Sequence, residues 1–246
     1  MSDQQPRVVI VLPTYQEAEN IQKLVRAVHA AAPLAGFIVC DDNSPDGTGQ
    51  LAEALVGEIP DLQVVHRPDK LGLGAAYRDG FARAIASGAD IVLQMDVDFS
   101  HDPAVVPLLI AAVSEGADVA IGSRYVPGGN TPDWPFHRKM LSKYGNEYAR
   151  WMLRLGCHDA TAGFRAYRAD ILTAIKFEET KANGYGFQIE TAWRLTAAGA
   201  KFAEVPITFR DRTEGESKMS IAIMSETMRL VTRWGIGLRR GRSMPE

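Results

Sequence analysis

Two aspartates, Asp96 and Asp98, stand directly after the apolar run of residues 91–95. A short apolar run bounded by charge is typical of a buried strand in a parallel sheet. Two carboxylates at positions i and i+2 of a strand end point to the same side, so both can bind one hard cation. Mg²⁺ and Mn²⁺ suit such oxygen ligands and are usually also held by substrate phosphates. The motif indicates a phosphorylated ligand, although a solvated loop after a strand can have the same sequence.

Polar side chains also follow two other predicted strands. Pro13, Tyr15 and Glu17 follow the first strand, and Asp41 and Asp42 follow the second. Ligands of open α/β sheets bind at the carboxyl ends of the strands. A carboxylate there can accept hydrogen bonds from a nucleobase or ribose, Tyr15 can stack on a base, and Glu17 can bond it. The residues leave open which of Asp41 and Asp42 contacts the base, and a turn with an ordinary helix start would look alike.

Cationic side chains occur in three later segments. Arg124 follows the fifth predicted strand, Arg138 and Ser142 open a basic helix, and Arg212 and Lys218 lie in a polar loop. Arginine suits bidentate phosphate contacts, and a loop with two cations can close over a diphosphate and exclude water. The alternative interpretations are a solvated helix face and an ordinary surface loop.

Two motifs point to ligands that the context excludes. Residues 72–77 resemble a dinucleotide fingerprint, but the third glycine is missing. The fingerprint also has to follow the first strand of a βαβ unit directly, which these residues do not. Residues 42–53 resemble a calcium loop, but a strand enters it where an EF-hand needs a helix, and Pro45 lies inside it. We therefore expect neither NAD nor calcium binding.

Strands and helices must alternate to bring these residues together. Apolar runs predict five strands, and helical spacing predicts a helix after each of the first four. This order is typical of an α/β fold with a doubly wound, mostly parallel sheet and helices on both faces. The predicted strands cover residues 7–12, 37–40, 62–66, 91–95 and 118–121.

The later part of the chain has a different pattern. We expect one domain over residues 1–246, with a loop and basic helix over residues 125–155. A mobile polar loop follows at residues 210–219, and an amphipathic helix at residues 220–240. Shorter elements are a strand at 163–167, a helix at 187–198 and a strand at 201–209.

Composition excludes several classes of protein. The chain has 246 residues, a net charge of −3 and 46% hydrophobic residues, as expected of a globular domain without global attraction to nucleic acid. Its two cysteines give no disulfide framework, which favours a reducing cytosol. We expect no signal peptide, because the start is short and polar, and no transmembrane helix, because no run of 18 apolar residues occurs.

Nine stretches together resemble the dolichol- or polyprenyl-phosphate mannosyltransferases of family 2 of the inverting glycosyltransferases. The resemblance runs from about residue 9 to 220, nearly the whole chain, and keeps the family's order. PTYQEAEN and the Asp-x-Asp motif are shared broadly, whereas LGLGAAY, SHDP and GESK narrow the match. The remaining stretches are DDNSPDGT, GSRY, DATAGFRAYR, NGYGFQIE and EVPITFRDR.

The resemblance implies a nucleotide-sugar-binding fold of the glycosyltransferase A type and a role for each matching residue. The guanosine of GDP-mannose would be held by Pro13, Tyr15, Glu17, Cys40 and Asp42. The ribose, diphosphate and a Mg²⁺ or Mn²⁺ ion would be held by Asp96, Val97 and Asp98. Ser100 stands where some relatives have a glutamine that binds the metal. The lipid phosphate would bind Arg124, Arg138 and Ser142, and Arg212 and Lys218 would clamp the diphosphate. The residues implied in catalysis are Asp98, Arg124, Arg212 and Lys218.

The activity implied is inverting transfer of mannose from GDP-mannose to a polyprenyl monophosphate. Alternatives are UDP-glucose as donor, a soluble sugar hydroxyl as acceptor, and a non-catalytic subunit that binds nucleotide or recruits a membrane partner. A hydroxyl acceptor needs a base such as Asp159, for which we favour a positioning role. The intact Asp-x-Asp and the cations around GESK argue against a silent subunit.

The resemblance also implies a membrane-bound acceptor. The chain looks like a short form without transmembrane helices, cytoplasmic and attached peripherally to the cytoplasmic face or through an anchoring partner. Residues 137–155 and 221–238 are the candidate membrane contacts, since a basic amphipathic helix can lie in the interface. Packing against the core is the alternative for both helices.

Overall fold

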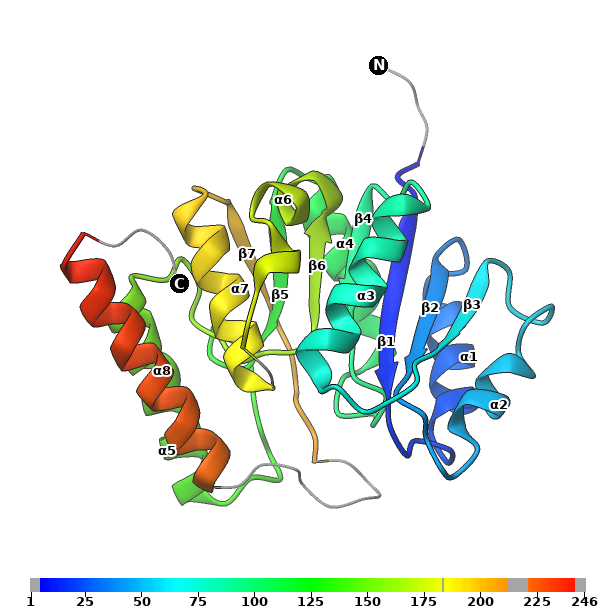
Figure 1. The fold of residues 1–246 in the computed structure, drawn as a ribbon, viewed down its shortest axis with the longest axis horizontal. Helices are drawn as coiled ribbons and strands as arrows, with labels where there is room; N and C mark the ends of the chain where they lie inside the picture. The colour runs from blue at the N-terminus through cyan, green and yellow to red at the C-terminus, as the bar shows by residue number, and fades with distance from the viewer. Residues whose placement is uncertain (1–4, 183, 212–220, 242–246) are drawn as a thin grey trace.

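The computed structural model describes residues 5–182, 184–211 and 221–241, so Arg212 and Lys218 lie outside the described residues. Within these ranges the chain forms a seven-stranded sheet in the order β3-β2-β1-β4-β6-β5-β7 (Figure 1). The strands are β1 Val8–Thr14, β2 Gly36–Asp41, β3 Leu62–His66, β4 Ile91–Gln94, β5 Val119–Ser123, β6 Arg165–Arg168 and β7 Phe202–Pro206.

The sheet is mostly parallel, as predicted, with one inserted antiparallel strand. β1, β2, β3 and β4 pair in parallel, and so do β5 and β7. β6 lies between β4 and β5 and is antiparallel to both. β5 therefore does not pair with β4. The chain leaves the sheet after β5 and returns through β6, so the amino end of β6 meets the carboxyl ends of the parallel strands.

Helices cover both faces of the sheet, which confirms the predicted architecture. Alternate residues of β1 point to opposite sides: Val9 and Val11 join one core cluster, and Ile10 and Leu12 join the other. The helices are α1 Ile21–Ala31, α2 Thr48–Glu53, α3 Leu73–Ala86, α4 Val106–Ser114, α5 Phe136–Leu153, α6 Ala169–Ala174, α7 Tyr185–Ala197 and α8 Ile221–Arg239. Short 3₁₀ turns occupy Pro103–Val105 and Phe177–Glu179.

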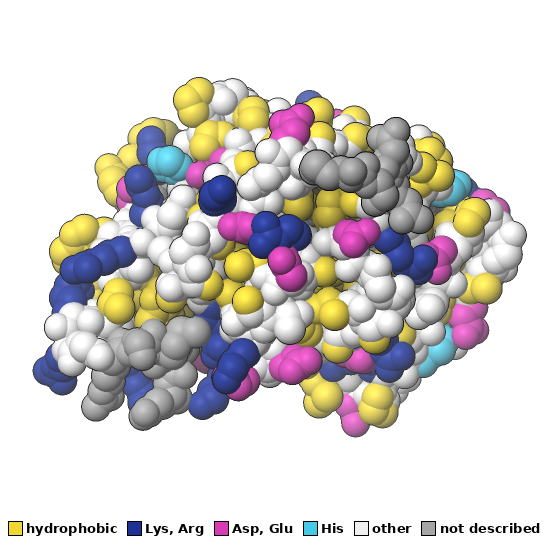
Figure 2. All heavy atoms as spheres, turned by 90° about the horizontal axis from the view of Figure 1, so that it is seen from above, with side chains coloured by type: hydrophobic (Ala, Val, Ile, Leu, Met, Phe, Trp, Pro, Cys, Tyr) yellow, Lys and Arg dark blue, Asp and Glu magenta, His cyan; other side chains and the backbone are white. Residues whose placement is uncertain are grey.

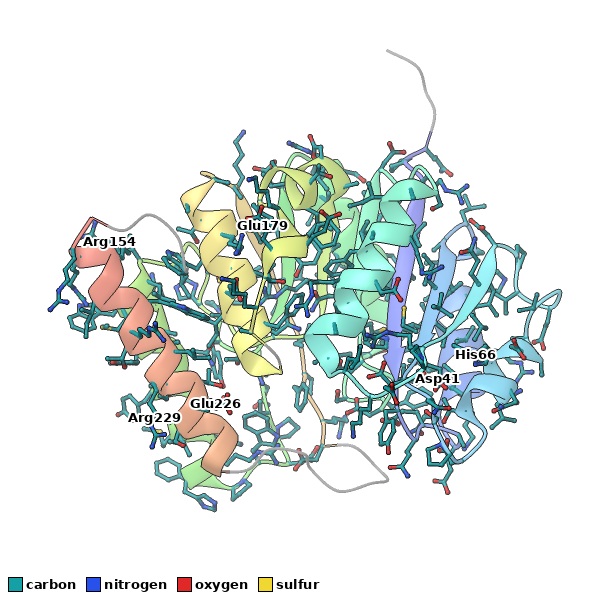
Figure 3. The ribbon with its side chains drawn as sticks, in the orientation of Figure 1. Asp41, His66, Arg154, Glu179, Glu226 and Arg229 are labelled. Carbon is teal, nitrogen blue, oxygen red and sulfur yellow. The ribbon has the colours of Figure 1, made fainter. Side chains whose placement is uncertain are left out.

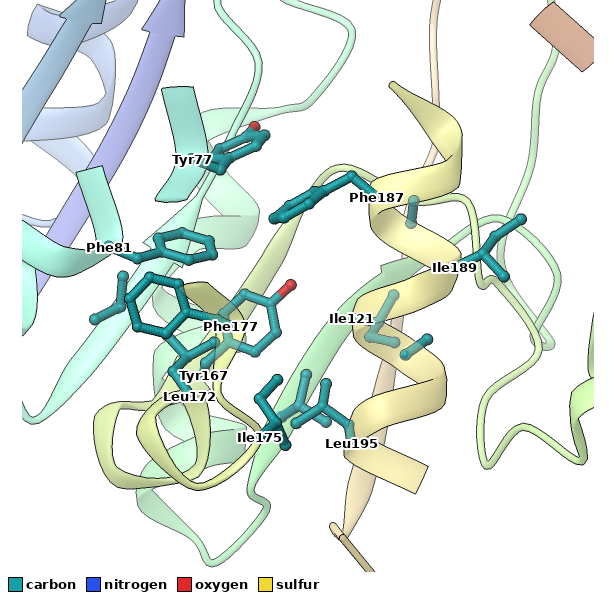
Figure 4. Packing of buried hydrophobic residues seen from close by; sticks show 14 of the residues in the cluster. Tyr77, Phe81, Ile121, Tyr167, Leu172, Ile175, Phe177, Phe187, Ile189 and Leu195 are labelled. Carbon is teal, nitrogen blue, oxygen red and sulfur yellow. The ribbon is translucent and has the colours of Figure 1, made fainter. Parts of the chain in front are cut away.

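Aromatic rings fix α3 and α7 relative to one another (Figure 4). Tyr77 stacks on Phe187 with ring centroids 5.7 Å apart and an interplanar angle of 9°. Phe81 meets Tyr167 edge-on at 5.7 Å. Gly80 permits the close approach of α3 to the sheet, because a Cβ there would lie 2.3 Å from Cγ1 of Val11. This packing holds Tyr77 at the edge where the parallel strands end.

The last helix packs against the body of the protein along one face. The hydroxyls of Tyr148 on α5 and Thr232 on α8 lie 2.8 Å apart, Trp234 contacts Trp193 of α7, and Val231 is fully buried. One face of α8 therefore belongs to the core. Core packing was one of the two interpretations of residues 221–238, and membrane contact was the other. In the described part of the chain, no helix has the length and apolar character needed to span a bilayer.

Candidate active site

A cavity of about 270 Å³ lies at the carboxyl ends of the parallel strands, the lower edge of the sheet in Figure 1. Its walls come from the ends of β1, β2 and β4, the start of α3, the segment before β6 and the start of α7. Seven residues predicted from the sequence line it together: Pro13, Tyr15, Glu17, Asp42, Asp96, Val97 and Asp98. Figure 2 views the opposite edge, where acidic and basic side chains are interspersed.

Asp96 is oriented by groups that the sequence analysis did not identify. The hydroxyl of Tyr77 donates to Asp96 Oδ1 at 3.2 Å, and His101 Nε2 lies 3.8 Å from Oδ2. Burial, and next the charge of Asp96, raise the pKa of Tyr77 well above its usual range, so the hydroxyl keeps its proton. A Cβ at Gly163 would stand 3.1 Å from Asp96 Oδ2, so glycine leaves space beside this carboxylate.

The residues around Asp98 fit a divalent cation. Asp98 is buried, and its Oδ1 accepts a hydrogen bond from the backbone N–H of Ser100 at 3.0 Å. The hydroxyl of Ser100 is buried and has no hydrogen-bond partner among the described residues. A buried hydroxyl oxygen without a partner, on the residue that bonds the Asp98 carboxylate, matches the oxygen donors of Mg²⁺ sites. Within the described ranges, no group of three His, Cys, Asp or Glu side chains could bind a metal unaided, so substrate oxygens would have to complete the coordination.

Asp42, rather than Asp41, reaches the cavity. Asp41 is used locally, because Oδ1 accepts from the hydroxyls of Thr14 and Ser44 and Oδ2 from the Ser44 N–H. In Figure 3 it lies beside His66, its register partner across β2 and β3. Asp42 forms a buried ion pair with Arg67, which follows β3. Burial raises the pKa of Asp42, and the Arg67 charge opposes that rise.

Tyr15 and Lys70 line the cavity together with Asp42. The Lys70 ammonium lies 3.6 Å from the centroid of the Tyr15 ring, within the range of a cation–π contact. An aromatic face, a cation and the Asp42–Arg67 pair give this part of the cavity the stacking and hydrogen-bonding groups that a nucleobase needs.

The side chain of Cys40 does not line the cavity. It is fully buried in the core between β2 and α3, and a Cβ added to Gly80 would meet its sulfur at 3.1 Å. Burial raises the pKa of its thiol to about 12, which keeps it neutral. The residue alternation of β2 explains the position, since Cys40 points to the face opposite its neighbour Val39.

Arg124 lies beside the cavity and is fixed by a buried carboxylate. Its Nε and Nη2 donate to Oδ2 and Oδ1 of Asp159 at 2.8 and 2.6 Å, and Nη2 also donates to Thr161 Oγ1 at 2.7 Å. Burial alone would raise the pKa of Asp159, but the charge and hydrogen bonds of Arg124 outweigh it, and the net shift is downward. Because Thr161 also lines the cavity, it joins Arg124 to the cavity wall.

Arg138 and Ser142 lie on α5, next to Arg124. The guanidinium carbons of Arg138 and Arg124 lie 4.2 and 5.5 Å from the centroid of the Trp134 ring, so one indole contacts both cations. Arg138 Nη1 is 3.0 Å from both carboxylate oxygens of Asp211. Ser142 Oγ accepts a hydrogen bond from the Tyr125 hydroxyl at 2.6 Å. The three residues predicted to bind the acceptor phosphate therefore lie in one region outside the cavity.

Comparisons with known proteins agree with this geometry. The family model described as glycosyl transferase family 2 matches residues 9–175. A polyprenol monophosphomannose synthase of Mycolicibacterium smegmatis is 47% identical over 96% of this chain and 88% of that protein. An undecaprenyl-phosphate mannosyltransferase of Micrococcus luteus is 46% identical over 95% of this chain and 96% of that protein.

A more distant relative and a solved structure extend the comparison. A dolichol-phosphate mannosyltransferase of Pyrococcus furiosus is 35% identical over 92% of this chain and 63% of that protein. Glucosyl-3-phosphoglycerate synthase of Mycobacterium tuberculosis, solved with Mn²⁺, UDP and glucosyl-3-phosphoglycerate, superposes with a TM-score of 0.68. That match is 22% identical and covers 98% of this chain and 81% of the other. It demonstrates a shared fold and nothing more specific.

Proposed function

The chain belongs to glycosyl transferase family 2, and we propose that it transfers mannose from GDP-mannose to a polyprenyl (dolichyl-type) monophosphate. One observation carries the proposal. A cavity with the carboxylates Asp96 and Asp98 borders Arg124 through Thr161, and Arg124 shares the Trp134 ring with Arg138. A nucleotide sugar needs a cavity with carboxylates such as Asp96 and Asp98. A phosphorylated acceptor needs cations such as Arg124 and Arg138. The names of the relatives at 47% and 46% identity support mannose and a polyprenyl phosphate.

The donor would lie along the cavity. Asp42, Tyr15 and Lys70 would bind the guanosine, and Asp96 and Asp98 would lie beside the diphosphate. Asp96, Asp98 and the unpartnered Ser100 hydroxyl would hold a divalent cation, Mg²⁺ or Mn²⁺. When bound, such an ion neutralises charge on the diphosphate and so favours departure of GDP. Arg212 and Lys218 would contribute further positive charge.

The acceptor phosphate would lie against Arg124, Arg138 and Ser142. The second pKa of a phosphate monoester is about 6, so the acceptor is largely a dianion at neutral pH and needs no strong base. One phosphate oxygen attacks the anomeric carbon of mannose. The bond from that carbon to the diphosphate oxygen breaks, and its electron pair leaves with GDP. A single displacement inverts the centre, so α-linked GDP-mannose gives a β-linked mannosyl phosphate lipid.

A membrane contact would bring the protein to its lipid acceptor. Phe136, Tyr144 and Trp151 repeat at intervals of eight and seven residues along α5, which puts them on one helix face, and all three are exposed. Arg154, which follows the helix, and Arg239 are exposed, and the Arg239 guanidinium carbon lies 4.5 Å from the centroid of the Trp151 ring. Aromatic side chains flanked by cations suit the interface of an anionic bilayer. We infer peripheral attachment through α5, alone or together with an anchoring partner.

Transfer of labelled sugar in detergent tests the proposal. GDP-mannose and a polyprenyl phosphate are incubated with Mg²⁺, with Mn²⁺ and with EDTA, and UDP-glucose serves as a parallel donor. We expect metal-dependent mannolipid whose anomeric one-bond C–H coupling reports the β configuration. Glucolipid instead would overturn the donor, and α-linked product would overturn the displacement. Nucleotide binding without any lipid product, also in the presence of membranes, would favour a non-catalytic subunit.

A further inference from the structure

The amide of Gln188 on α7 is a polar group for which the described structure provides no complete set of partners. The side chain is 2% exposed and lines the cavity. Its Oε1 accepts a hydrogen bond from Gln94 Nε2 at 2.9 Å, but its Nε2 is buried and has no partner among the described residues. An unsatisfied buried donor lowers stability, so it is rarely retained without a ligand or a water to bond.

The orientation of this amide follows from a neighbouring carbonyl. The carbonyl of Gly163 can only accept, and Gln94 donates to it through Nε2 at 3.0 Å. Nε2 of Gln94 must therefore also be the atom that faces Gln188, and it meets Oε1. The Tyr167 hydroxyl occupies Gln94 Oε1 at 2.9 Å and completes the set. The N–H₂ of Gln188 is thus the end that remains available for another acceptor.

The strand order indicates which part of the donor reaches this amide. The cavity crosses strand ends in the order β2, β1, β4, β6, with Asp42 and Tyr15 at one end and Gly163 at the other. If the base lies at Asp42 and Tyr15 and the diphosphate lies at Asp96, the next group along the cavity is the sugar. Gly163 and Gln188 form the wall beyond Asp96. This step rests on the proposed function, because it assumes that the nucleoside lies at the Asp42 end.

We propose that Gln188 Nε2 donates a hydrogen bond to a hydroxyl of the transferred hexose and thereby contributes to recognition of the sugar. A neutral amide suits a hydroxyl oxygen, whereas the phosphates would lie beside Asp96 and Asp98 and the cation that these residues would hold. Gln188 therefore distinguishes a nucleotide sugar from the free nucleotide.

The test compares the affinities of GDP-mannose and GDP by calorimetry, with Mg²⁺ and without acceptor. Gln188→Met keeps the length of the side chain and removes the hydrogen bonds. We expect its affinity for GDP-mannose to fall about 3- to 10-fold, as expected for one lost hydrogen bond, while its affinity for GDP changes less than about twofold. Gln22→Met is the control, since Gln22 is a partly buried glutamine on α1 that does not line the cavity and donates to the Leu51 carbonyl.

A second variant, Gln188→Glu, distinguishes the sugar from a phosphate. A hydroxyl can donate as well as accept, so a carboxylate can bond it, and affinity for GDP-mannose should recover toward the wild-type value. A phosphate partner would instead be repelled, and both ligands would bind more weakly. That result overturns the sugar assignment, as does an unchanged GDP-mannose to GDP ratio in Gln188→Met. Thermal melting checks folding, and Gln188→Leu replaces the methionine variant if that one unfolds.

The inference and the proposed function fail in different ways. A wild-type protein that forms no mannolipid overturns the proposed function. If glucolipid forms instead, the same ratio is measured with UDP-glucose and UDP, and a ratio that Gln188→Met does not lower overturns the inference.

Discussion

Arg124 and Asp159 form a bidentate ion pair in which the carboxylate is fully buried: Nη2 lies 2.6 Å from Oδ1, and Nε lies 2.8 Å from Oδ2. Glu204 fixes the backbone at Asp159, because its carboxylate accepts hydrogen bonds from the N–H groups of His158 and Asp159. A carboxylate held in this way has both oxygens engaged with a cation. Asp159 is therefore suited to orient Arg124 and poorly suited to remove a proton from an acceptor.

Asp159→Asn tests this positioning role. The change leaves Arg124 with a neutral partner in a buried place, and breaking a buried pair costs about 3–5 kcal/mol. We expect that loss in the free energy of unfolding measured with urea. We also expect transfer at low acceptor concentration to fall at least about tenfold, as for a weakened hydrogen bond to a charged group. The control Asp170→Asn breaks an exposed pair with Arg168 and should cost less than about 1 kcal/mol.

Stability at acid pH should depend on the same carboxylate. The pKa of Asp159 is lower in the folded protein than the usual value, which is about 3.9 in an unfolded chain. Between the two pKa values the unfolded state binds more protons, so stability rises with pH across this window. The contribution is complete above about pH 4 and is lost as pH falls through the folded pKa. Urea midpoints from pH 6 to pH 3 should fall more steeply for the wild type than for Asp159→Asn, and equal slopes would contradict the assignment.

Arg67→Ala tests the pairing of Arg67 with Asp42. Both side chains are 7% exposed, so removing the cation leaves Asp42 buried without its main opposing charge. The carboxyl would then take up a proton more readily, since burial already raises its pKa. We expect affinity for GDP to fall about tenfold or more, as measured by calorimetry. Arg26→Ala removes an arginine from an exposed ion pair with Glu58, and a similar loss there would point to a general charge effect.

Much of the fold could be predicted from local sequence patterns. The apolar runs identified the strands β1 to β5, of which β3 is partly exposed and the other four are buried. The spacing of Ile21, Leu24 and Val28 identified α1, where all three are fully buried. The position of β6 between β4 and β5 could not be derived, because RAYR is short and polar at both ends and its pairing is non-local. The six-residue α6 was missed for a similar reason, since it is too short to show a helical period.

Part of the candidate site could also be predicted from the sequence. Asp42, Asp96 and Asp98 followed from the rule that ligands bind at strand ends, and all three line the cavity. Arg67 and Gln188 did not follow, because their partners are 25 and 94 residues away in the chain. Weak signals existed: Arg67 directly follows a strand on the same edge, and Gln94 is a glutamine inside an apolar run. Cys40 precedes two aspartates at the end of β2, but its side chain points into the core, since position next to a site residue does not determine the direction of a side chain.

Asp98→Ala tests the metal site together with removal of the ion. If Asp98 holds a divalent cation beside the diphosphate, its loss and addition of EDTA should each reduce transfer at least about 100-fold, as expected when a major electrostatic contact is removed. Thermal melting of the variant should stay close to that of the wild type. Asp69→Ala, an exposed aspartate outside the cavity lining, should behave as the wild type does. Normal turnover of Asp98→Ala would refute the metal assignment.

Arg138→Ala tests the acceptor phosphate site. Arg138 is 27% exposed, lies over the Trp134 ring and contacts the Asp211 carboxylate. An incoming phosphate can replace that carboxylate, because both are anions that match a guanidinium. We therefore expect the KM for a short-chain polyprenyl phosphate to rise about tenfold or more, which is the value of one charged hydrogen bond, with little change in the KM for GDP-mannose. Lys143→Ala removes one positive charge from the same helix and should leave both constants nearly unchanged in detergent. Equal effects of Arg138→Ala on both substrates would place the acceptor elsewhere.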